Sequence, residues 1–315
     1  MFKLSGMNKS IKVFSPATVA NVGSGFDILG FALGNRGDII EVLPNNEKSL
    51  RIINKSDTDL PLNPAKNVAS VAVAALLGEL SSEQGFDLVF HQKISPGSGI
   101  GSSAASSAGS VFAVNELLDR PFTLKQLVAF AMQGEKIASG VAHADNVAPA
   151  LLGGFTLIRS YHPLDIIQLP SPENLLCTIS HPDIIVRTED SRKILLKEIL
   201  LKDAVIQWGN VAGLVSGLYT NDYELIGRSL QDVIIEPVRA LLIPGFDTIK
   251  KAVVKAGALG CSISGSGPSI FALSNSDEVA SRVEQVMQQV FKSMDIEVDT
   301  FTSHINKQGQ QILSV

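Results

Sequence analysis

The sequence predicts an α+β protein with two domains. Its 315 residues exceed the length of an average domain, so we expect two domains that share a cleft. Helical patterns, strand patterns and hairpins are mixed along the chain, which favours an α+β architecture over a doubly wound parallel sheet. A loop that holds Pro163, Pro170 and Pro172 marks the expected boundary, with one domain at 1–168 and the other at 169–315.

The first half of the chain contains the clearest helix signals. The segment 102–118 is rich in small residues and ends shortly before Pro121, which stops a helix. Thr123 is expected to cap a further helix that runs to about Ser139. A buried helix is expected at 67–80, where Ala, Leu and Val occur without turn residues. Strand-like apolar runs occupy 11–14, 38–43, 85–94 and 155–159.

The second half begins with a strand and three helical segments, after which strands and a helix alternate to the end. No internal repeat and no low-complexity stretch interrupts this order. Strands are expected at 175–180, 258–264, 269–273 and 297–303, and helices at 192–200, 205–219, 223–229 and 278–294.

The composition is that of a folded, mildly acidic protein. Apolar residues make up 45% of the chain and charged residues 18%, which is enough to fill a core and too apolar for a disordered chain. The net charge of −5 gives no basic surface for a nucleic-acid backbone. Only 6% of the residues are aromatic, with a single Trp, so no base-stacking platform is expected. The sequence therefore predicts no nucleic-acid partner.

The chain shows no targeting signal. Its first residues, Met1 to Gly6, contain no apolar segment of the kind that a signal peptide needs, and Met7 is an alternative start. No apolar run approaches the roughly 18–20 residues that a membrane span requires. Cys177 and Cys261 lack the spacing of a zinc site, and two free buried thiols are favoured over one disulfide. We therefore expect a cytoplasmic protein without a membrane partner.

A glycine-rich loop, Gly97–Ser103, lies between an expected strand and the helix at 102–118. Its glycines let backbone N–H groups approach a ligand, and the helix directs its positive end at the same place, which suits a phosphate. A tight turn that binds nothing is the alternative. A Walker A loop would need a lysine where Ser102 stands. A Rossmann motif would need an acidic residue after a second strand, whereas Asp119 closes a helix, so the loop belongs to neither class.

Three ordered motifs resemble those of one kinase superfamily. The loop from Pro96 to Ala105 is similar to the ATP loop of the galactokinase, homoserine kinase, mevalonate kinase and phosphomevalonate kinase (GHMP) superfamily. The segments 16–27 and 264–269 resemble its other two motifs. Two small departures in the ATP loop, a proline placed one residue later and an isoleucine for a leucine, leave every polar group in place. Similarity to the homoserine kinase group in particular is carried by 143–154, 188–192 and 236–239.

The resemblance implies a two-domain GHMP kinase fold. Its N-terminal domain would be like ribosomal protein S5 and its C-terminal domain ferredoxin-like, with the active site in the cleft between them. The implied reaction is the ATP-dependent phosphorylation of the side-chain hydroxyl of L-homoserine, in L-threonine biosynthesis. Another kinase of the superfamily, acting on a sugar or an isoprenoid alcohol, and a non-catalytic sensor of ATP and metabolite are the alternatives. The family also implies a homodimer.

The resemblance assigns ATP and Mg²⁺ to particular residues. Glu135, with Ser103 and Thr188, is implied to hold Mg²⁺, which prefers oxygen ligands. The alternative for Glu135 is an exposed helix residue paired with Lys136 or Lys125. The residues implied to bind ATP are Asn67, Ser95, Pro96, Gly97, Ser98, Gly99, Ile100, Gly101, Ser102, Ser103, Ala104 and Ala105. Asn67 is explained equally well as a helix cap.

The homoserine kinase group implies a site for an amino acid. Arg192 and Arg239 suit its carboxylate, because arginine binds carboxylates bidentately, and Asp27 suits its ammonium. Surface salt bridges with Glu189, Asp190 or Glu236 are the alternative for the arginines. Turn chemistry is the alternative for both Asn21 and Asp27. Asn146 stands where several relatives place an aspartate base, so as a catalytic residue it is implied to orient the hydroxyl without taking its proton. The implied substrate residues are Asn21, Asp27, His143, Asn146, Arg192 and Arg239, and the alternative for the histidine is a structural role.

Overall fold

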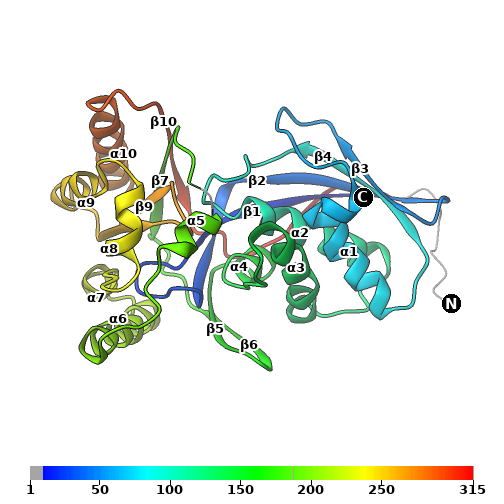
Figure 1. The fold of residues 1–315 in the computed structure, drawn as a ribbon, viewed down its shortest axis with the longest axis horizontal. Helices are drawn as coiled ribbons and strands as arrows, with labels where there is room; N and C mark the ends of the chain where they lie inside the picture. Colours follow the sequence, from blue (N-terminus) through cyan, green and yellow to red (C-terminus); the bar gives the residue numbers. More distant parts are fainter. Residues whose placement is uncertain (1–9, 187, 315) are drawn as a thin grey trace.

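The structure is a computed structural model that describes residues 10–186 and 188–314, without the side chains of Ser139 and Thr188. In this part of the chain two lobes lie side by side, each built on a β-sheet with helices packed against it (Figure 1). The predicted α+β class is confirmed.

The first lobe contains a sheet of seven strands among the described residues. Its strands are β1 (Ile11–Ala20), β2 (Leu29–Asn45), β3 (Leu50–Asn54), β4 (Gly85–Gln92), β5 (Phe155–Tyr161), β6 (Leu164–Leu169) and β11 (Gln311–Ser314). They run in the order β11-β1-β2-β4-β3, and β5 and β6 form a hairpin that pairs with β2. All pairs are antiparallel except β3 with β4.

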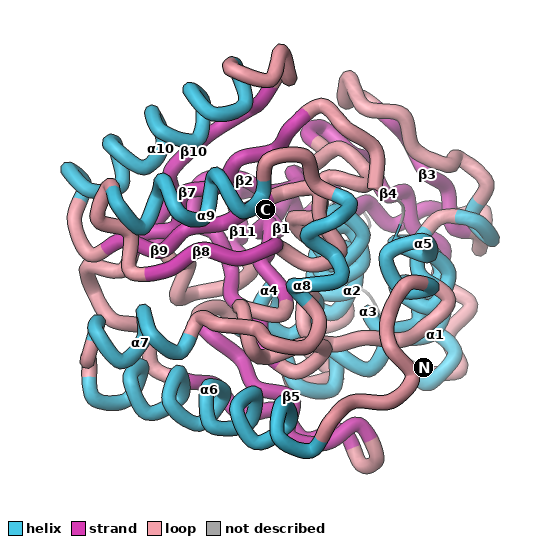
Figure 2. The backbone as a smooth tube through the Cα atoms, turned by 60° about the vertical axis from the view of Figure 1, so that its left-hand side comes forward, coloured by secondary structure: helices cyan, strands magenta, loops and turns pink. Residues whose placement is uncertain are grey.

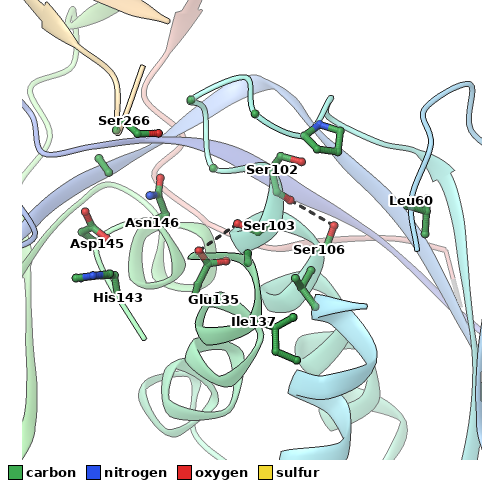
Figure 3. A pocket seen from close by; sticks show the side chains of 18 of the residues that line it. Leu60, Ser102, Ser103, Ser106, Glu135, Ile137, His143, Asp145, Asn146 and Ser266 are labelled. Atoms are coloured by element: carbon green, nitrogen blue, oxygen red, sulfur yellow. Dashed lines mark hydrogen bonds between the residues drawn. The ribbon is translucent and has the colours of Figure 1, made fainter. Parts of the chain in front are cut away.

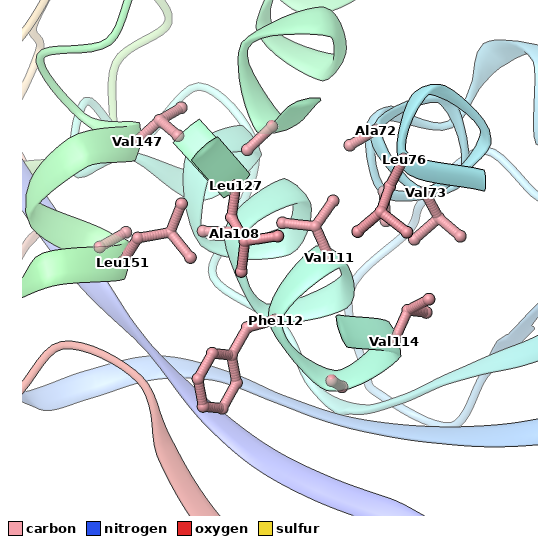
Figure 4. Close-up of a cluster of buried hydrophobic side chains, with 14 of the residues drawn as sticks. Ala72, Val73, Leu76, Ala108, Val111, Phe112, Val114, Leu127, Val147 and Leu151 are labelled. Carbon is pink, nitrogen blue, oxygen red and sulfur yellow. The ribbon is translucent and has the colours of Figure 1, made fainter. Parts of the chain in front are cut away.

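Four helices of the described part of the chain pack on this sheet. They are α1 (Val68–Glu79), α2 (Ser102–Leu117), α3 (Leu124–Ser139) and α4 (Val147–Leu152), and a short turn, η1 (Pro64–Lys66), precedes the first. α2 lies in the middle, where Val111 packs among side chains such as Leu76 of α1 (Figure 4). Small residues allow this position, because a side chain on Gly109 would come within 2.8 Å of Ser15. Thr123 caps α3, as predicted, and Gln126 completes a capping box with it.

The second lobe contains a four-stranded antiparallel sheet, within the described ranges, in the order β10-β7-β9-β8. Its elements are β7 (Leu176–Pro182), α5 (Thr188–Lys193), α6 (Leu201–Thr220), α7 (Tyr223–Ser229), α8 (Glu236–Arg239), η2 (Ala240–Leu242), α9 (Phe246–Lys255), β8 (Gly260–Ile263), β9 (Ile270–Ser274), α10 (Asp277–Lys292) and β10 (Val298–His304). Side chains of β9 alternate between two cores, so that Ile270 and Ala272 face α9 and α10. Phe271 and Leu273 face α6, α7 and the first lobe. The ring of Phe271 meets that of Phe31 of β2 edge to face, which joins the lobes.

Most predicted elements are present, and one is wrong. The expected helix at 192–200 is instead the short α5, followed by a stretch without helix up to Leu200. Most of the apolar residues that suggested a longer helix, such as Leu196, are exposed and are not part of the hydrophobic cores of the described residues. β3, β6, β11, α4, α8 and α9 are absent from the prediction. All of these except α9 have only four to six residues, too few for a clear periodic pattern.

Three further expectations concern the whole chain. The predicted domain boundary lies near the end of β6 at Leu169, and it stays a prediction, while β11 belongs to the sheet of the first lobe. Cys177 and Cys261 are free and buried, as expected. No helix among residues 10–186 and 188–314 is both long and apolar enough to cross a membrane.

Candidate active site

A cavity of about 380 Å³ lies between the two lobes, at the N-terminal end of α2 (Figure 3). Its walls come from segments far apart in the sequence: the loop after β1, the glycine loop, the end of α3, the loop before α4, α5, and the loop between β8 and β9. Most of the residues that the sequence suggested meet here. Those that line the cavity are Asn21, Asp27, Asn67, Pro96, Gly97, Gly99, Gly101, Ser102, Ser103, Glu135, His143, Asn146, Arg192 and Arg239.

Five residues of the expected ATP loop do not line the cavity. Ser95 is exposed, and the side chains of Ser98, Ile100, Ala104 and Ala105 are buried behind the loop. Ile100 and Ala104 belong to the hydrophobic cores. These residues support the loop and the start of α2 from behind.

The glycine loop follows a path that requires glycine. Gly97, Gly99 and Gly101 have left-handed backbone, with φ of 79°, 76° and 70°. A side chain at Gly99 would come within 2.7 Å of the carbonyl oxygen of Gly267. One at Gly101 would come within 2.0 Å of the hydroxyl oxygen of Thr18. The loop ends where α2 begins, and no described side chain caps that helix end, so its first N–H groups suit a phosphate.

The loop between β8 and β9 packs directly against the glycine loop. The hydroxyl of Ser264 donates to the carbonyl oxygen of Gly99 at 2.7 Å, and that of Ser269 donates to the carbonyl oxygen of Ser98 at 2.5 Å. The N–H of Gly265 donates to the carbonyl oxygen at the end of β1, at 3.2 Å. The three motifs noted in the sequence therefore form one connected structure across the two lobes.

Lys93 is a cavity residue that the sequence analysis missed. Its ammonium donates to the hydroxyl of Ser102 at 2.5 Å and lies 3.3 Å from a carboxylate oxygen of Asp38. Asp38 is fully buried and also accepts from the hydroxyl of Ser106 at 2.7 Å. Burial lowers the pKa of Lys93, and the carboxylate of Asp38 acts against that shift. A cationic group thus lies beside the first turn of α2, and the sequence holds no motif that would have indicated it.

One end of the cavity is apolar and contains Asn67. The side-chain oxygen of Asn67 accepts from the N–H of Ala69 at 2.9 Å, which caps α1. Its amide nitrogen donates to the carbonyl oxygen of Pro61 at 2.8 Å. The helix-cap interpretation of this residue therefore holds, although the residue also borders the cavity. The apolar neighbours at this end are Leu60, Pro61, Val68, Phe90 and Ile137.

Glu135 and Ser103 face each other in the cavity wall (Figure 3). The hydroxyl of Ser103 donates to a carboxylate oxygen of Glu135 at 3.1 Å. Glu135 is only 7% exposed, and burial raises the pKa of its carboxyl group to about 7. It is therefore not the exposed helix residue of the alternative interpretation. The side chain of Thr188, the third expected magnesium ligand, lies outside the described residues.

This arrangement fits Mg²⁺ bound partly by protein and partly by phosphate. A carboxylate and a hydroxyl at the edge of a cavity supply the hard oxygen ligands that Mg²⁺ prefers. Among the described residues, no group of three His, Cys, Asp or Glu side chains could hold a metal by itself. A cation at this place would need further oxygen ligands from a bound nucleotide or from water.

The two arginines line the cavity close to Asp27 and to each other. Arg192 binds the carboxylate of Asp27 through both guanidinium NH₂ groups, at 2.8 and 3.3 Å. Arg239 is 3% exposed, donates to the carbonyl oxygen of Gly265 at 2.9 Å and lies over the ring of Phe26. Burial and the nearby Arg192 lower the pKa of Arg239 to about 10, so it stays charged at neutral pH.

The acidic residues considered as surface partners of these arginines pair with lysines. Lys193 pairs with Glu189 and Asp190, and Lys250 pairs with Glu236. The acidic partner within the cavity is instead Asp27, from the loop after β1.

Asn21 holds Asp27 in an unusual backbone conformation. Both residues have left-handed backbone, with φ of 71° and 58°. The side-chain oxygen of Asn21 accepts from the N–H of Asp27 at 3.0 Å, and its amide nitrogen donates to the carbonyl oxygen of Gly265 at 2.7 Å. Turn chemistry therefore explains the side-chain contacts of Asn21, while the carboxylate of Asp27 faces the cavity.

His143, Asp145 and Asn146 lie together beside these charged groups (Figure 3). His143 Nδ1 is 3.6 Å from Asp27, and burial lowers the pKa of the imidazole, which favours its neutral form. The side-chain oxygen of Asn146 accepts from the hydroxyl of Thr18 at 2.7 Å. The side chain of Asp145, next to Asn146 in the sequence, also lines the cavity. Burial, with the charges of Asp27 and Glu135, raises the pKa of Asp145 to about 7.

Comparisons with known proteins agree with the motifs. The family model "GHMP kinases N terminal domain" matches residues 66–154, and "GHMP kinases C terminal" matches residues 214–293. A protein of Chlorobium phaeobacteroides (strain BS1) described as homoserine kinase is 48% identical over 319 residues, covering 97% of this chain and 100% of its own.

Solved structures give the same picture. The crystal structure of homoserine kinase from Cytophaga hutchinsonii is 52% identical, covers 99% of this chain and 100% of its own, and has a TM-score of 0.94. The structure of L. major mevalonate kinase with R-mevalonate has a TM-score of 0.72 at 16% identity, covering 97% of this chain and 99% of its own. At this low identity, the similarity to mevalonate kinase shows only that the two proteins share a fold.

Proposed function

This chain belongs to the homoserine kinases of the GHMP kinase family, and we propose how its cavity transfers the γ-phosphoryl group of ATP to the side-chain hydroxyl of L-homoserine. The products are O-phospho-L-homoserine and ADP, in L-threonine biosynthesis. One observation carries the assignment of residues: a single cavity joins a helix end suited to phosphates with a cluster of charges suited to an amino acid. A non-catalytic sensor is disfavoured, because the glycine loop and Glu135 both line this cavity.

ATP is proposed to lie along the cavity with its phosphates at the N-terminal end of α2. The N–H groups after Gly101 would bind the phosphates, and the ammonium of Lys93 adds positive charge beside the same helix turn. The adenine ring would occupy the apolar end near Phe90 and Ile137, which suits a flat, largely apolar group.

Mg²⁺ is proposed to bind at Glu135 and Ser103, with Thr188 assigned only by the resemblance. When bound there, the ion would neutralise the charge of the phosphates. Glu135 must be ionised to hold it, and the burial that raises its pKa to about 7 makes a nearby positive charge favourable.

The ammonium and carboxylate of L-homoserine are proposed to exchange with an existing ion pair. Asp27 and Arg192 bind each other in the structure. Asp27 would turn to the ammonium, and Arg192 together with Arg239 would bind the carboxylate. A zwitterion can replace both halves of the pair and leave no buried charge unpaired, whereas a neutral alcohol cannot.

Asn146 is proposed to orient the reacting hydroxyl. An amide can hydrogen-bond a hydroxyl but does not accept its proton at neutral pH. The hydroxyl oxygen attacks the γ-phosphorus as the bond to the β-phosphate oxygen breaks, and ADP leaves. Because the transition state is loose, the proton can pass late to a phosphate oxygen without a carboxylate base.

The choice of substrate tests this assignment. Arg239→Ala should lower kcat/KM for L-homoserine and leave the rate with 3-amino-1-propanol, which lacks the carboxylate, nearly unchanged. An exposed arginine changed in the same way, Arg159→Ala, is the matched control. An equal loss with both alcohols would show that Arg239 only supports the fold.

We also propose that the enzyme forms a homodimer through the outer face of α6 (Figure 2). Leu201, Val205, Trp208 and Tyr219 lie along one exposed stripe of this helix, and Trp208 is 55% exposed. A side chain at Gly209 would meet open space, so the same face offers a shallow site for the Trp208 ring of an antiparallel second copy.

The enzyme is also proposed to work in the cytoplasm. Its two buried free thiols fit the reducing conditions there.

The dimer is tested by its mass in solution. Light scattering should give twice the chain mass for the wild type and the monomer mass for Val205→Glu, which places a charge in the stripe. Gln289→Glu on α10 is the control and should remain dimeric. A wild-type monomer, or a dimer that survives Val205→Glu, would refute this surface.

A further inference from the structure

The hydroxyl of Tyr161 connects two loops of the active site from outside the cavity. Tyr161 ends β5, in the hairpin that lies beside α4 (Figure 1), and it is not among the residues that line the cavity. Its hydroxyl donates to the carbonyl oxygen of Asp27 at 2.8 Å. The same oxygen accepts from the N–H of Ala144 at 3.3 Å. One side chain thus bridges the loop after β1 and the loop before α4.

Both bridged loops carry groups assigned to the amino-acid substrate. Asp27 supplies the carboxylate that pairs with Arg192. Ala144 is flanked by His143 and Asp145, and these side chains line the cavity. The distance between the two loops therefore sets the distance between the groups that would bind the ammonium and those beside the reacting hydroxyl.

The bridge matters most for Asp27, because its left-handed backbone is unfavourable for a residue with a side chain. Two hydrogen bonds to its backbone hold Asp27 in this conformation. Asn21 accepts from the N–H of Asp27, and Tyr161 donates to its carbonyl oxygen. With both sides of the residue fixed, its carboxylate has a fixed direction into the cavity.

The surroundings of Tyr161 keep its hydroxyl a donor. Burial raises the pKa of the phenol, and the neighbouring carboxylates of Asp145 and Asp27 raise it further. The ring also meets the imidazole of His143 edge to face, with ring centres 6.3 Å apart. The residue therefore supports the position of His143 as well as that of the two backbones.

We propose that Tyr161 is a positioning residue for the phosphoryl acceptor, and that its hydroxyl sets the affinity for the amino acid without affecting ATP. This inference rests on the proposed function of the cavity. The glycine loop, α2 and Lys93 make no hydrogen bond to Tyr161 among the described contacts, so the nucleotide end should not respond to its loss.

The variant Tyr161→Phe removes only the hydroxyl and tests the proposal by steady-state kinetics. We expect KM for L-homoserine to rise about tenfold, the change that corresponds to about 1.4 kcal/mol of lost binding. KM for ATP should stay within about twofold of the wild type, as expected when a single buried hydrogen bond far from the nucleotide is lost. Tyr223→Phe, at a partly buried tyrosine of α7 outside the cavity, is the matched control and should behave as the wild type. An unchanged KM for L-homoserine, or an equal rise in both KM values, would overturn the proposal.

Amide hydrogen exchange gives a second measurement that needs no turnover. In Tyr161→Phe, exchange should quicken in the segments 21–28 and 141–146 and stay unchanged in 95–105. Uniform quickening would indicate general destabilisation and refute a positioning role. A wild type that does not phosphorylate L-homoserine would instead refute the proposed function, so the two failures are distinguishable.

Discussion

Asp145 offers a quantitative prediction, because its carboxyl group is buried in a cluster of other charges. Burial, Asp27 and Glu135 raise its pKa from an ordinary 3.8 to about 7. The folded protein therefore binds a proton at Asp145 between about pH 4 and pH 7 that the unfolded chain has lost, and stability falls as pH rises through this window. The difference in pKa corresponds to about 4 kcal/mol at pH 8, as an upper limit.

The variant Asp145→Asn removes this cost, since an amide does not ionise. Its free energy of unfolding relative to the wild type should increase by up to about 3 kcal/mol between pH 4.5 and pH 8, since the part of the window below pH 4.5 is not covered. Urea unfolding of the ligand-free proteins at both pH values measures this difference, with the exposed Asp59→Asn as control. A relative stability that does not change with pH would refute the buried, raised-pKa description of Asp145.

The same variant separates orientation from base catalysis. Loss of a general base typically costs about 10²–10⁴-fold in rate. We expect Asp145→Asn to cost much less, because Asn146 orients the hydroxyl and no carboxylate base is required. A wild-type rate that falls below a single pKa, together with a flat pH profile in Asp145→Asn, would show that Asp145 is the base.

Three further variants test the nucleotide, metal and acceptor ends of the site. Gly99→Val should raise KM for ATP or abolish turnover, since the side chain cannot fit beside Gly267 and the loop must move; wild-type kinetics in a folded variant would contradict this. Glu135→Ala should lower kcat by orders of magnitude and weaken the dependence on Mg²⁺, and an unchanged magnesium titration would leave Glu135 a structural residue. Asn146→Ala should lower kcat without shifting the acid limb of the pH–rate profile; a shifted limb would contradict a purely orienting role.

Local signals in the sequence were enough to predict the glycine loop and the helix that follows it, while phosphate binding at this place stays a prediction. Several glycines followed by a helix of small residues indicate this loop from neighbouring residues alone, although distant contacts such as that of Ser264 with Gly99 also hold its path. Thr123 and its capping box are predictable for the same reason. The α+β class followed from the mixture of periodic patterns. The glycine loop and the helix cap are predictable because the residues that define each of them are close together in the sequence.

Contacts between distant residues could not be predicted in this way. Lys93 meets Asp38, and Tyr161 meets Asp27, only because the folded sheet brings residues 55 and 134 positions apart together. For Glu135 a local pattern even favoured the wrong environment, since a glutamate near lysines on a helix is usually exposed. Burial against Ser103 is a property of the packed lobe.

The central claim is that one cavity brings ATP and L-homoserine together for phosphoryl transfer. The most direct test is the initial rate of ADP formation with ATP and Mg²⁺, measured for L-homoserine, mevalonate and galactose, with the phosphorylated product identified by ³¹P NMR. The account predicts O-phospho-L-homoserine as the product and a kcat/KM for L-homoserine several decades above that for the other alcohols, because only the amino acid satisfies Asp27 and both arginines. Comparable rates with mevalonate or galactose, or no phosphorylation of L-homoserine at all, would contradict it.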